Sequence, residues 1–144
     1  MSKPILIGWR EWVHFPDLGI KAIKAKVDTG ARTSALHAYF VEPYSKNNQD
    51  YVRFGIHPIQ GDNETTLICE APVHDERQVT DSGGHKENRY VISTRVQLGK
   101  LTKTIELTLT NRDTMKFRML LGRTALENDF HVDAAGSFLL GKIK

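Results

Sequence analysis

The sequence predicts an all-β protein, folded as a small barrel or closed sandwich with one short helix near the C-terminal end. Apolar residues alternate with charged or polar ones, most clearly in 23–27 and 105–109, and such alternation is typical of half-buried strands. Few segments carry apolar residues at helical spacing over three turns. Turn-forming residues separate the runs, which predicts several hairpins. These turn signals lie at 15–19, 60–63, 81–84, 98–100 and 111–114.

β-branched and aromatic residues between these turns predict the strands. The expected strands span 5–13, 20–27, 51–57, 65–71, 90–98, 102–110 and 138–140. In the stretch 117–129 a further apolar strand ends at Gly122 and leads into a short helix. We place this helix at 124–128, with Thr124 as its cap and Glu127 completing a capping box. The polar stretch 43–50 is expected to be a surface loop.

Length and composition indicate one domain, residues 1–144, with an ordinary core. No apolar run is long enough to span a membrane and the first residues do not resemble a secretion signal, so we expect a cytoplasmic protein with no membrane partner. The formal net charge of +3 is spread along the chain. It weakly favours an acidic partner and does not indicate nucleic acid. The single cysteine, Cys69, lies in an apolar run and is expected in the core.

An acidic residue, Asp28, directly follows an apolar strand and is followed by Thr29 and Gly30. Desolvation by the core and hydrogen bonding within a tight loop act in opposite directions on such a carboxyl group. Gly30 permits the turn, and the Thr29 hydroxyl can hold it. Taken alone, an Asp-Thr-Gly motif is most simply a turn cap.

The second apolar strand, ending at Gly122 and followed by Arg123, makes the pattern more specific. An apolar strand ending in Asp-Thr-Gly, crossed by a second one ending in Gly-Arg, resembles the catalytic core of retroviral-type aspartic proteases. Further motifs are "KAKVDTGARTSALHA", "VTDSGGH", "ELTLTNRDTMKFRMLLGRTAL" and "FLLG". With them the sequence, from residue 7 to 141, resembles a bacterial family labelled ATP-dependent zinc proteases, the RimB-like group of retropepsin-like proteins.

This resemblance implies a retropepsin-like closed barrel, a homodimer, and trimming of the glutamate tails that a RimK-type ligase adds to a ribosomal protein. Asp28 would be the catalytic carboxylate, with Thr29 bonding across the dimer axis and Gly30 shaping the loop. Gly122 would pack under the loop, and Arg123 would either pair with an acid at the subunit contact or touch substrate. Peptide hydrolysis by this chemistry needs two carboxylates that share a proton. A two-fold homodimer supplies both from one sequence.

A second motif, Asp81-Ser82-Gly83, leaves two interpretations open. It could provide a second aspartate within one chain, or it could be the tip of a hairpin that covers the cleft as a flap. The polar residues around it and the two consecutive glycines favour the flap. Arg32, His85, Lys86 and Arg89 could present cations to an acidic peptide, or could simply form a solvated face. The expected substrate-binding residues are Ala31, Arg32, Ser82, Gly83, Gly84 and His85.

The histidines show no zinc-protease spacing, and the only dense cluster is His74-Asp75-Glu76. No phosphate-binding loop for ATP is present. We therefore expect no metal and no cofactor. A competing hypothesis is a non-catalytic module that grips an acidic tail or partner, and a third is a metalloprotease.

Overall fold

The computed structural model describes residues 3–80, 83–111 and 117–141. Within these ranges most of the regular structure is β-strand. The helices are one 3₁₀-helix, η1 (Pro16–Leu18), and one short α-helix, α1 (Arg123–Leu126). The strands are β1 (Ile5–Ile7), β2 (Arg10–Phe15), β3 (Ile20–Asp28), β4 (Ser34–His37), β5 (Phe40–Lys46), β6 (Gln49–Ile56), β7 (Leu67–Pro72), β8 (Asp75–Thr80), β9 (Lys86–Leu98), β10 (Leu101–Thr110), β11 (Met119–Gly122) and β12 (Phe130–Val132).

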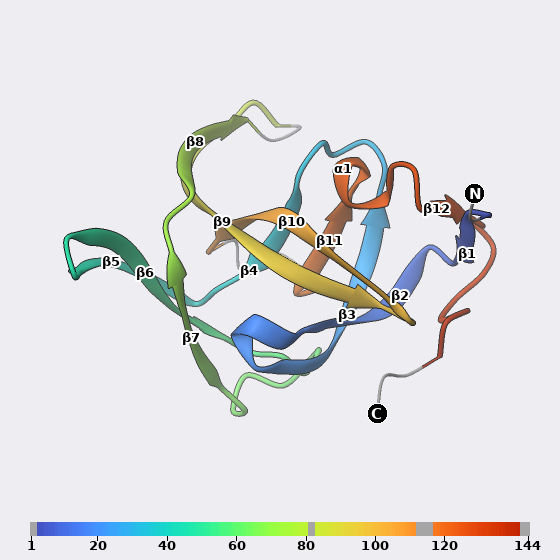
Figure 1. The fold of residues 1–144 in the computed structure, drawn as a ribbon, viewed down its shortest axis with the longest axis horizontal. Helices are drawn as coiled ribbons and strands as arrows, with labels where there is room; N and C mark the ends of the chain where they lie inside the picture. Colours follow the sequence, from blue (N-terminus) through green and yellow to red (C-terminus); the bar gives the residue numbers. More distant parts are fainter. Residues whose placement is uncertain (1–2, 81–82, 112–116, 142–144) are drawn as a thin grey trace.

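The main sheet closes on itself. Its strand order is β10-β4-β11-β3-β2-β9-β8, and β10 also pairs with β9, so the strands from β10 to β9 form a ring (Figure 1). The β8 strand extends this ring as an edge strand beside the first part of β9. The predicted all-β, retropepsin-like fold is confirmed. None of the described helices is long and apolar enough to cross a membrane.

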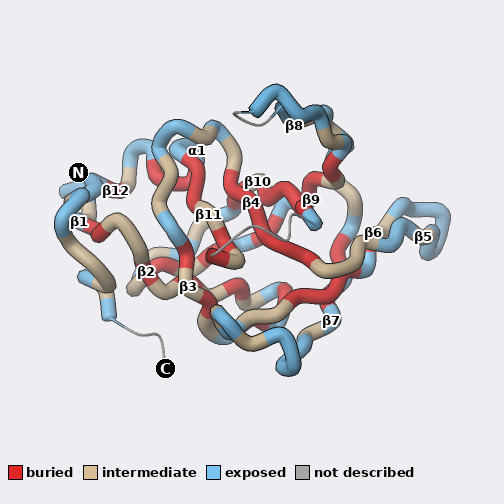
Figure 2. Tube along the Cα trace, turned by 180° about the vertical axis from the view of Figure 1, so that it is seen from behind, coloured by how far each residue is buried: buried red, intermediate tan, exposed pale blue. Residues whose placement is uncertain are grey.

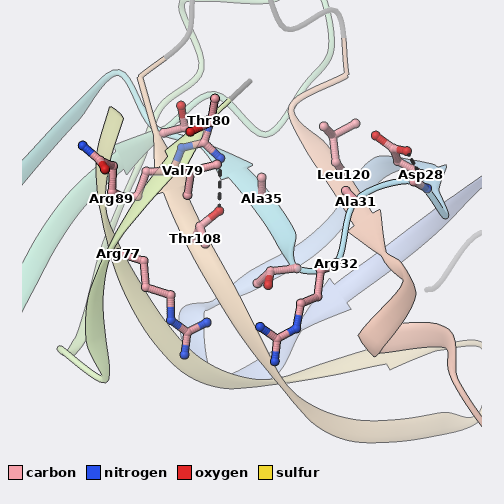
Figure 3. A pocket seen from close by; sticks show the side chains of 14 residues that line it. Asp28, Ala31, Arg32, Ala35, Arg77, Val79, Thr80, Arg89, Thr108 and Leu120 are labelled. Atoms are coloured by element: carbon pink, nitrogen blue, oxygen red, sulfur yellow. Dashed lines mark hydrogen bonds between the residues drawn. The ribbon is translucent and has the colours of Figure 1, made fainter. Parts of the chain in front are cut away.

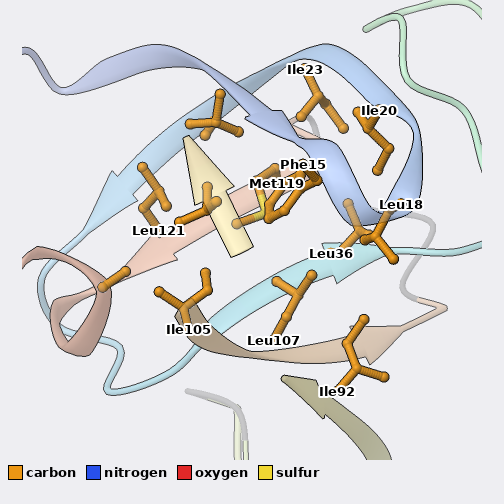
Figure 4. Packing of buried hydrophobic residues seen from close by; sticks show 14 of the residues in the cluster. Phe15, Leu18, Ile20, Ile23, Leu36, Ile92, Ile105, Leu107, Met119 and Leu121 are labelled. Atoms are coloured by element: carbon orange, nitrogen blue, oxygen red, sulfur yellow. The ribbon is translucent and has the colours of Figure 1, made fainter. Parts of the chain in front are cut away.

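Alternating side chains fill the ring. In β2 every second residue is buried, including Val13 and Phe15, and in β10 Ile105 and Leu107 point inward. Figure 4 shows Phe15, Ile105 and Leu107 among the side chains of the facing strands, and the buried stretches in Figure 2 follow the strands of the ring. Removal of this apolar surface from water is the main stabilising contribution to the fold. Cys69 is part of this core, as predicted.

The short β11 strand is part of the ring, where it pairs with β3 on one side and β4 on the other. It runs parallel to β3 with Gly122 opposite Asp28, and antiparallel to β4. A Cβ added to Gly122 would lie 2.6 Å from the carbonyl carbon of Thr33. Only glycine allows the two backbones to approach this closely. This arrangement places the loop after β3 against the start of α1.

The stretch 43–50, expected to be a loop, is instead a β-hairpin. The β5 and β6 strands pair from Phe40–Gly55 to Lys46–Gln49. Asn47 and Asn48 form the turn with φ values of 53° and 65°, and asparagine is one of the few residues other than glycine that accepts this left-handed conformation. The hairpin forms a separate three-stranded sheet with β7, in the order β5-β6-β7.

Other differences have local causes. The expected strand 5–13 divides into β1 and β2, because Gly8 passes so close to Gly136 that an added Cβ would lie 2.2 Å from its carbonyl oxygen. Residues 138–140 form a turn rather than a strand, and Phe138 has a φ of 52°. The α1 helix begins at Arg123 with Gly122 as its cap. The predicted cap, Thr124, donates its hydroxyl to the Arg32 carbonyl oxygen instead.

Candidate functional site

A cleft of about 520 Å³ lies between the loop after β3 and the antiparallel ribbon formed by β8 and the start of β9 (Figure 3). Five residues named from the sequence line this cleft: Asp28, Gly30, Ala31, Arg32 and Arg89. They share it with the strands on either side of the second motif. The full lining consists of Asp28, Gly30, Ala31, Arg32, Thr33, Ala35, Arg77, Gln78, Val79, Thr80, Arg89, Thr108, Thr110 and Leu120.

Asp28 is the last residue of β3 and is partly buried. Its Oδ1 accepts a hydrogen bond from the Gly30 amide at 3.1 Å, and its carbonyl oxygen accepts one from the Ala31 amide at 3.1 Å. The carboxylate therefore caps the turn, as its motif alone suggests. Its other oxygen makes no hydrogen bond within the described part of the chain, which leaves it available to water or substrate. Thr29 and Gly30 are exposed.

The residues that follow β11 form hydrogen bonds with the backbone of the Asp28 loop. The Arg123 amide donates to the Ala31 carbonyl oxygen at 2.8 Å, and the Thr124 amide and hydroxyl donate to that of Arg32 at 3.1 and 2.8 Å. The Arg123 guanidinium lies 3.5 Å from the Thr29 carbonyl oxygen. Arg123 thus contacts the loop backbone and does not line the cleft. These bonds fix the turn that carries Asp28.

The second motif joins two antiparallel strands. Thr80, the last residue of β8, pairs with Lys86, the first of β9. Asp81 and Ser82 lie outside the described residues. Gly83, Gly84 and His85 are exposed, and Gly84 has a φ of 83°. The pairing is that of a hairpin, which fits the flap interpretation, whereas the roles of Ser82 to His85 stay predictions.

Two arginines lie directly opposite each other on the ribbon. Arg77 pairs with Arg89, so both side chains project from the same face. Like charges in this position repel each other. They persist because each has an acidic partner. Hydrophobic periodicity in the sequence does not identify Arg77, because β8 is a polar strand in which apolar residues do not alternate with polar ones.

Arg77 is held by two carboxylates. Its guanidinium donates to both oxygens of Glu106 at 2.9 and 2.7 Å and to Asp75 at 2.7 Å. The hydrogen bond from Arg77 is the main reason that the pKa of Glu106 is lowered, and the bond to Glu106 raises the pKa of Arg77. His74 Nε2 lies 3.2 Å from the same glutamate, so His74 and Asp75 of the cluster noted from the sequence belong to this ion-pair network, whereas Glu76 does not join it within the part of the chain that the structure describes.

Arg89 is nearly buried, with 9% of its surface exposed. Its Nε donates to Glu87 at 2.9 Å, and its Nη1 lies 3.5 Å from the Thr108 hydroxyl. Thr108 in turn donates to the Ser34 carbonyl oxygen at 3.1 Å. This series of contacts joins the ribbon to β4, directly after the Asp28 loop.

Arg32 differs from these two arginines. It is exposed, and its guanidinium makes no hydrogen bond or ion pair with the residues that the structure describes. In Figure 3 it extends to the same side of the cleft as Arg77. Lys86 is exposed at the start of β9 and is not among the lining residues. Arg32 is therefore the cleft cation with the most donors to offer a ligand.

No group of three or more His, Cys, Asp or Glu side chains that could hold a metal ion occurs in the described ranges. Cys69 is buried, its thiol donates to the Leu18 carbonyl oxygen at 3.4 Å, and burial raises its pKa to about 11. Such a thiol is mostly protonated near neutral pH and is a poor ligand.

Comparison with known families gives a match over residues 6–142, to the family described as RimB-like, retropepsin-like aspartic endopeptidase RimB. The chain belongs to the RimB-like family. The matching description names neither zinc nor ATP, so the ATP-dependent zinc protease label in the expected resemblance has no support.

Curated relatives and one solved structure are also similar. A protein of Shewanella pealeana is 49% identical over 98% of the chain, and one of Desulfotalea psychrophila is 45% identical over 99%. Both are described as "Probable alpha-L-glutamate ligase". The chain spans 31% and 32% of their lengths, about a third of each. The crystal structure of a Legionella pneumophila protein of unknown function matches with a TM-score of 0.79 and 26% identity, over 96% of this chain and 99% of that one.

Proposed function

We propose that the chain is one subunit of a homodimeric aspartic peptidase whose catalytic centre combines Asp28 from two copies. The position of Asp28 carries this proposal. It lies on a fixed turn at the wall of a cleft, with one carboxylate oxygen bonded to the turn and the other unengaged by the described residues. Two such carboxylates within about 3 Å hold one proton between them, because both cannot ionise together. The ionised one takes a proton from water, and the neutral one donates to the peptide carbonyl oxygen.

The second copy is needed in this proposal because, among the described residues, Asp28 is the only acid that lines the cleft. The exposed Thr29 and Gly30 present the loop to a partner. A two-fold axis beside them would place the two Asp28 side chains next to each other. In that arrangement Thr29 bonds across the axis, and the loop stays rigid because the residues after Gly122 hold it.

The substrate that fits this cleft is an acidic peptide. Arg32 lines it and makes no ion pair with the described residues, and arginine binds carboxylates through paired hydrogen bonds. Arg77 and Arg89 also line it, but each is already bonded to a carboxylate of this chain. The relatives described as glutamate ligases suggest how such a peptide is made. The proposed substrate is a glutamate-rich tail on a ribosomal protein, added by a RimK-type ligase, and the peptidase trims it.

Replacement of Asp28 tests the chemistry. Asp28→Asn keeps an oxygen for the Gly30 amide, so the fold should persist, but it removes the acid. Release of glutamate from a glutamate-tailed peptide, followed by mass spectrometry, should fall by about 100-fold or more. Glu64→Gln, at an exposed acid away from the cleft, should match the parent. Unchanged turnover in Asp28→Asn would rule out the aspartic mechanism.

Mixing tests the shared centre. If two Asp28 side chains are required and subunits exchange freely, adding an equal amount of Asp28→Asn to the parent should lower turnover to about half, and a threefold excess to about a quarter. A parent activity that does not respond to the added variant would show that one chain suffices.

Arg32 tests the substrate class. Arg32→Gln should raise KM for the glutamate-tailed peptide more than for a glutamine-tailed one, with a smaller effect on kcat. Lys86→Gln is the matched control, because this cation is exposed but lies outside the cleft lining. Equal KM values for Arg32→Gln and the parent would contradict an acidic-peptide site.

A second candidate is a binding module that holds an acidic tail without cutting it. The names of the relatives favour it, since a ligase that extends such a tail needs to hold it. This module predicts that the parent binds a glutamate-tailed peptide without turnover, that Arg32→Gln weakens binding, and that Asp28→Asn does not.

A further inference from the structure

A second cavity, of about 300 Å³, lies outside the cleft, between the β5–β6 hairpin and the β8–β9 ribbon. Pro43 and Asp50 contribute from the hairpin, Val73 from the connection that precedes β8, and Glu76 and Tyr90 from the ribbon. The Val73 amide donates to the Asp50 carbonyl oxygen at 2.9 Å, which ties the two elements together at this point. The cavity thus has walls from separate sheets that are linked through the backbone.

The cavity carries two acids and no base. None of its lining residues is Lys, Arg or His. Within the described ranges, neither Asp50 nor Glu76 forms a salt bridge. Both act on the Tyr90 hydroxyl, whose pKa is raised by burial, then by the charge and hydrogen bond of Glu76, and by the charge of Asp50. Because all three residues line one cavity, a single ligand bound there would lie beside both carboxylates.

The β8–β9 ribbon separates this cavity from the cleft. Arg77 and Arg89 pair on one face, and Glu76 and Tyr90, the next pair along the ladder, project from the other. One face therefore brings two arginines, each paired with a carboxylate, to the cleft, whereas the other brings Glu76 and Tyr90 to the cavity. The formal net charge of the chain is +3, so two acids lower its magnitude and do not promote general solubility.

We propose that this cavity binds a lysine or arginine side chain of a polypeptide. The charged head would lie between Asp50 and Glu76, and its methylene stem against Pro43, Val73 and the Tyr90 ring. Long basic side chains have this division, with an apolar stem and a polar head, and an aromatic face adds a further attraction for the cation. The proposal does not depend on peptidase activity. If the proposed function also holds, a substrate with a basic body and an acidic tail could contact both faces of the ribbon.

The test is an NMR titration of the full chain at low ionic strength with the peptide acetyl-Ala-Arg-Ala-Arg-Ala-amide. Amide shifts should change at Asp50, Glu76 and Tyr90, and the same peptide with Gln for Arg should not bind. The double variant Asp50→Asn, Glu76→Gln should bind about fivefold to tenfold more weakly. Glu42→Gln is the matched control, because Glu42 is on the same hairpin but pairs with Arg53 at 2.8 Å, away from the cavity.

Three results would overturn the proposal. The parent could fail to bind the Arg peptide, the double variant could bind it as tightly as the parent, or Ca²⁺ alone could produce the same shifts and displace the peptide, which would indicate a metal site. Asp28→Asn should bind the peptide like the parent. If Asp28→Asn no longer releases glutamate but still binds the Arg peptide, the catalytic centre and this cavity act independently. Each proposal can therefore fail without the other. A thermal melt of each variant checks that it folds.

Discussion

The close approach of Gly122 to the Asp28 loop gives a quantitative test of the fold. In Gly122→Ala the new methyl carbon would lie 2.6 Å from the Thr33 carbonyl carbon, 2.8 Å from its oxygen and 2.9 Å from the Ser34 nitrogen. Carbon atoms pack at about 3.5 to 4.0 Å, so the backbone must move by about 1 Å. Overpacking of this kind costs about 1–3 kcal/mol. Movement also weakens the bond from the Gly122 amide to the Ser34 hydroxyl, now 3.0 Å long.

The free energy of unfolding should therefore fall by about 3 kcal/mol, with about 1 kcal/mol of this from the hydrogen bond. Urea denaturation at a fixed protein concentration measures it, and a slope of about 1.5 kcal/mol/M converts it to a midpoint about 2 M lower. Gly61→Ala is the control, because Gly61 has a φ of 80° and nothing within 4 Å of an added Cβ. It should cost only about 1 kcal/mol of backbone strain. The packing argument fails if Gly122→Ala costs no more than this control.

Three further predictions concern buried or paired groups. Glu11 is fully buried, and its carboxylate accepts hydrogen bonds from the amides of Gly8, Leu139 and Leu140. Glu11→Ala should therefore lower the free energy of unfolding by about 3 kcal/mol in urea titrations, and a change below about 1 kcal/mol would contradict this role. The lowered pKa of Glu106 means that its contribution is present above its ordinary value of 4.5 and is lost as the pH falls through the folded value; Glu106→Gln should make the acid limb of a stability profile less steep, and an unchanged slope would refute it. Because burial raises the pKa of Cys69 to about 11, a thiol reagent at pH 8 should label it only in urea.

The sequence predicted well the β3 and β10 strands, whose two faces differ in environment, and it predicted β2 in part, within the expected strand 5–13. The β2, β3 and β10 strands alternate because one side contacts the core. The β4 strand was missed because all four of its residues are buried between β10 and β11, so no alternation exists. The β8 strand was missed for the opposite reason, since it is a polar edge strand. The Asn47-Asn48 turn did leave a signal in its two asparagines.

The candidate site shows a similar division. The loop of Asp28 and the glycine behind it could be found, because each is a short motif with its own backbone requirement. Arg77 and Thr108 could not, because their position in the cleft depends on which strands pair and in which register. These pairings join distant parts of the chain, and local residue patterns do not specify them.

The parallel pairing of Asp28 with Gly122 joins positions that are 122 − 28 = 94 residues apart. A ribosome therefore exposes the acidic loop long before it makes the strand that supports it. Until residues 119–124 have emerged and inserted beside β3, the loop lacks its backbone anchors. A growing chain thus carries the acid without its rigid setting until this later strand has been made.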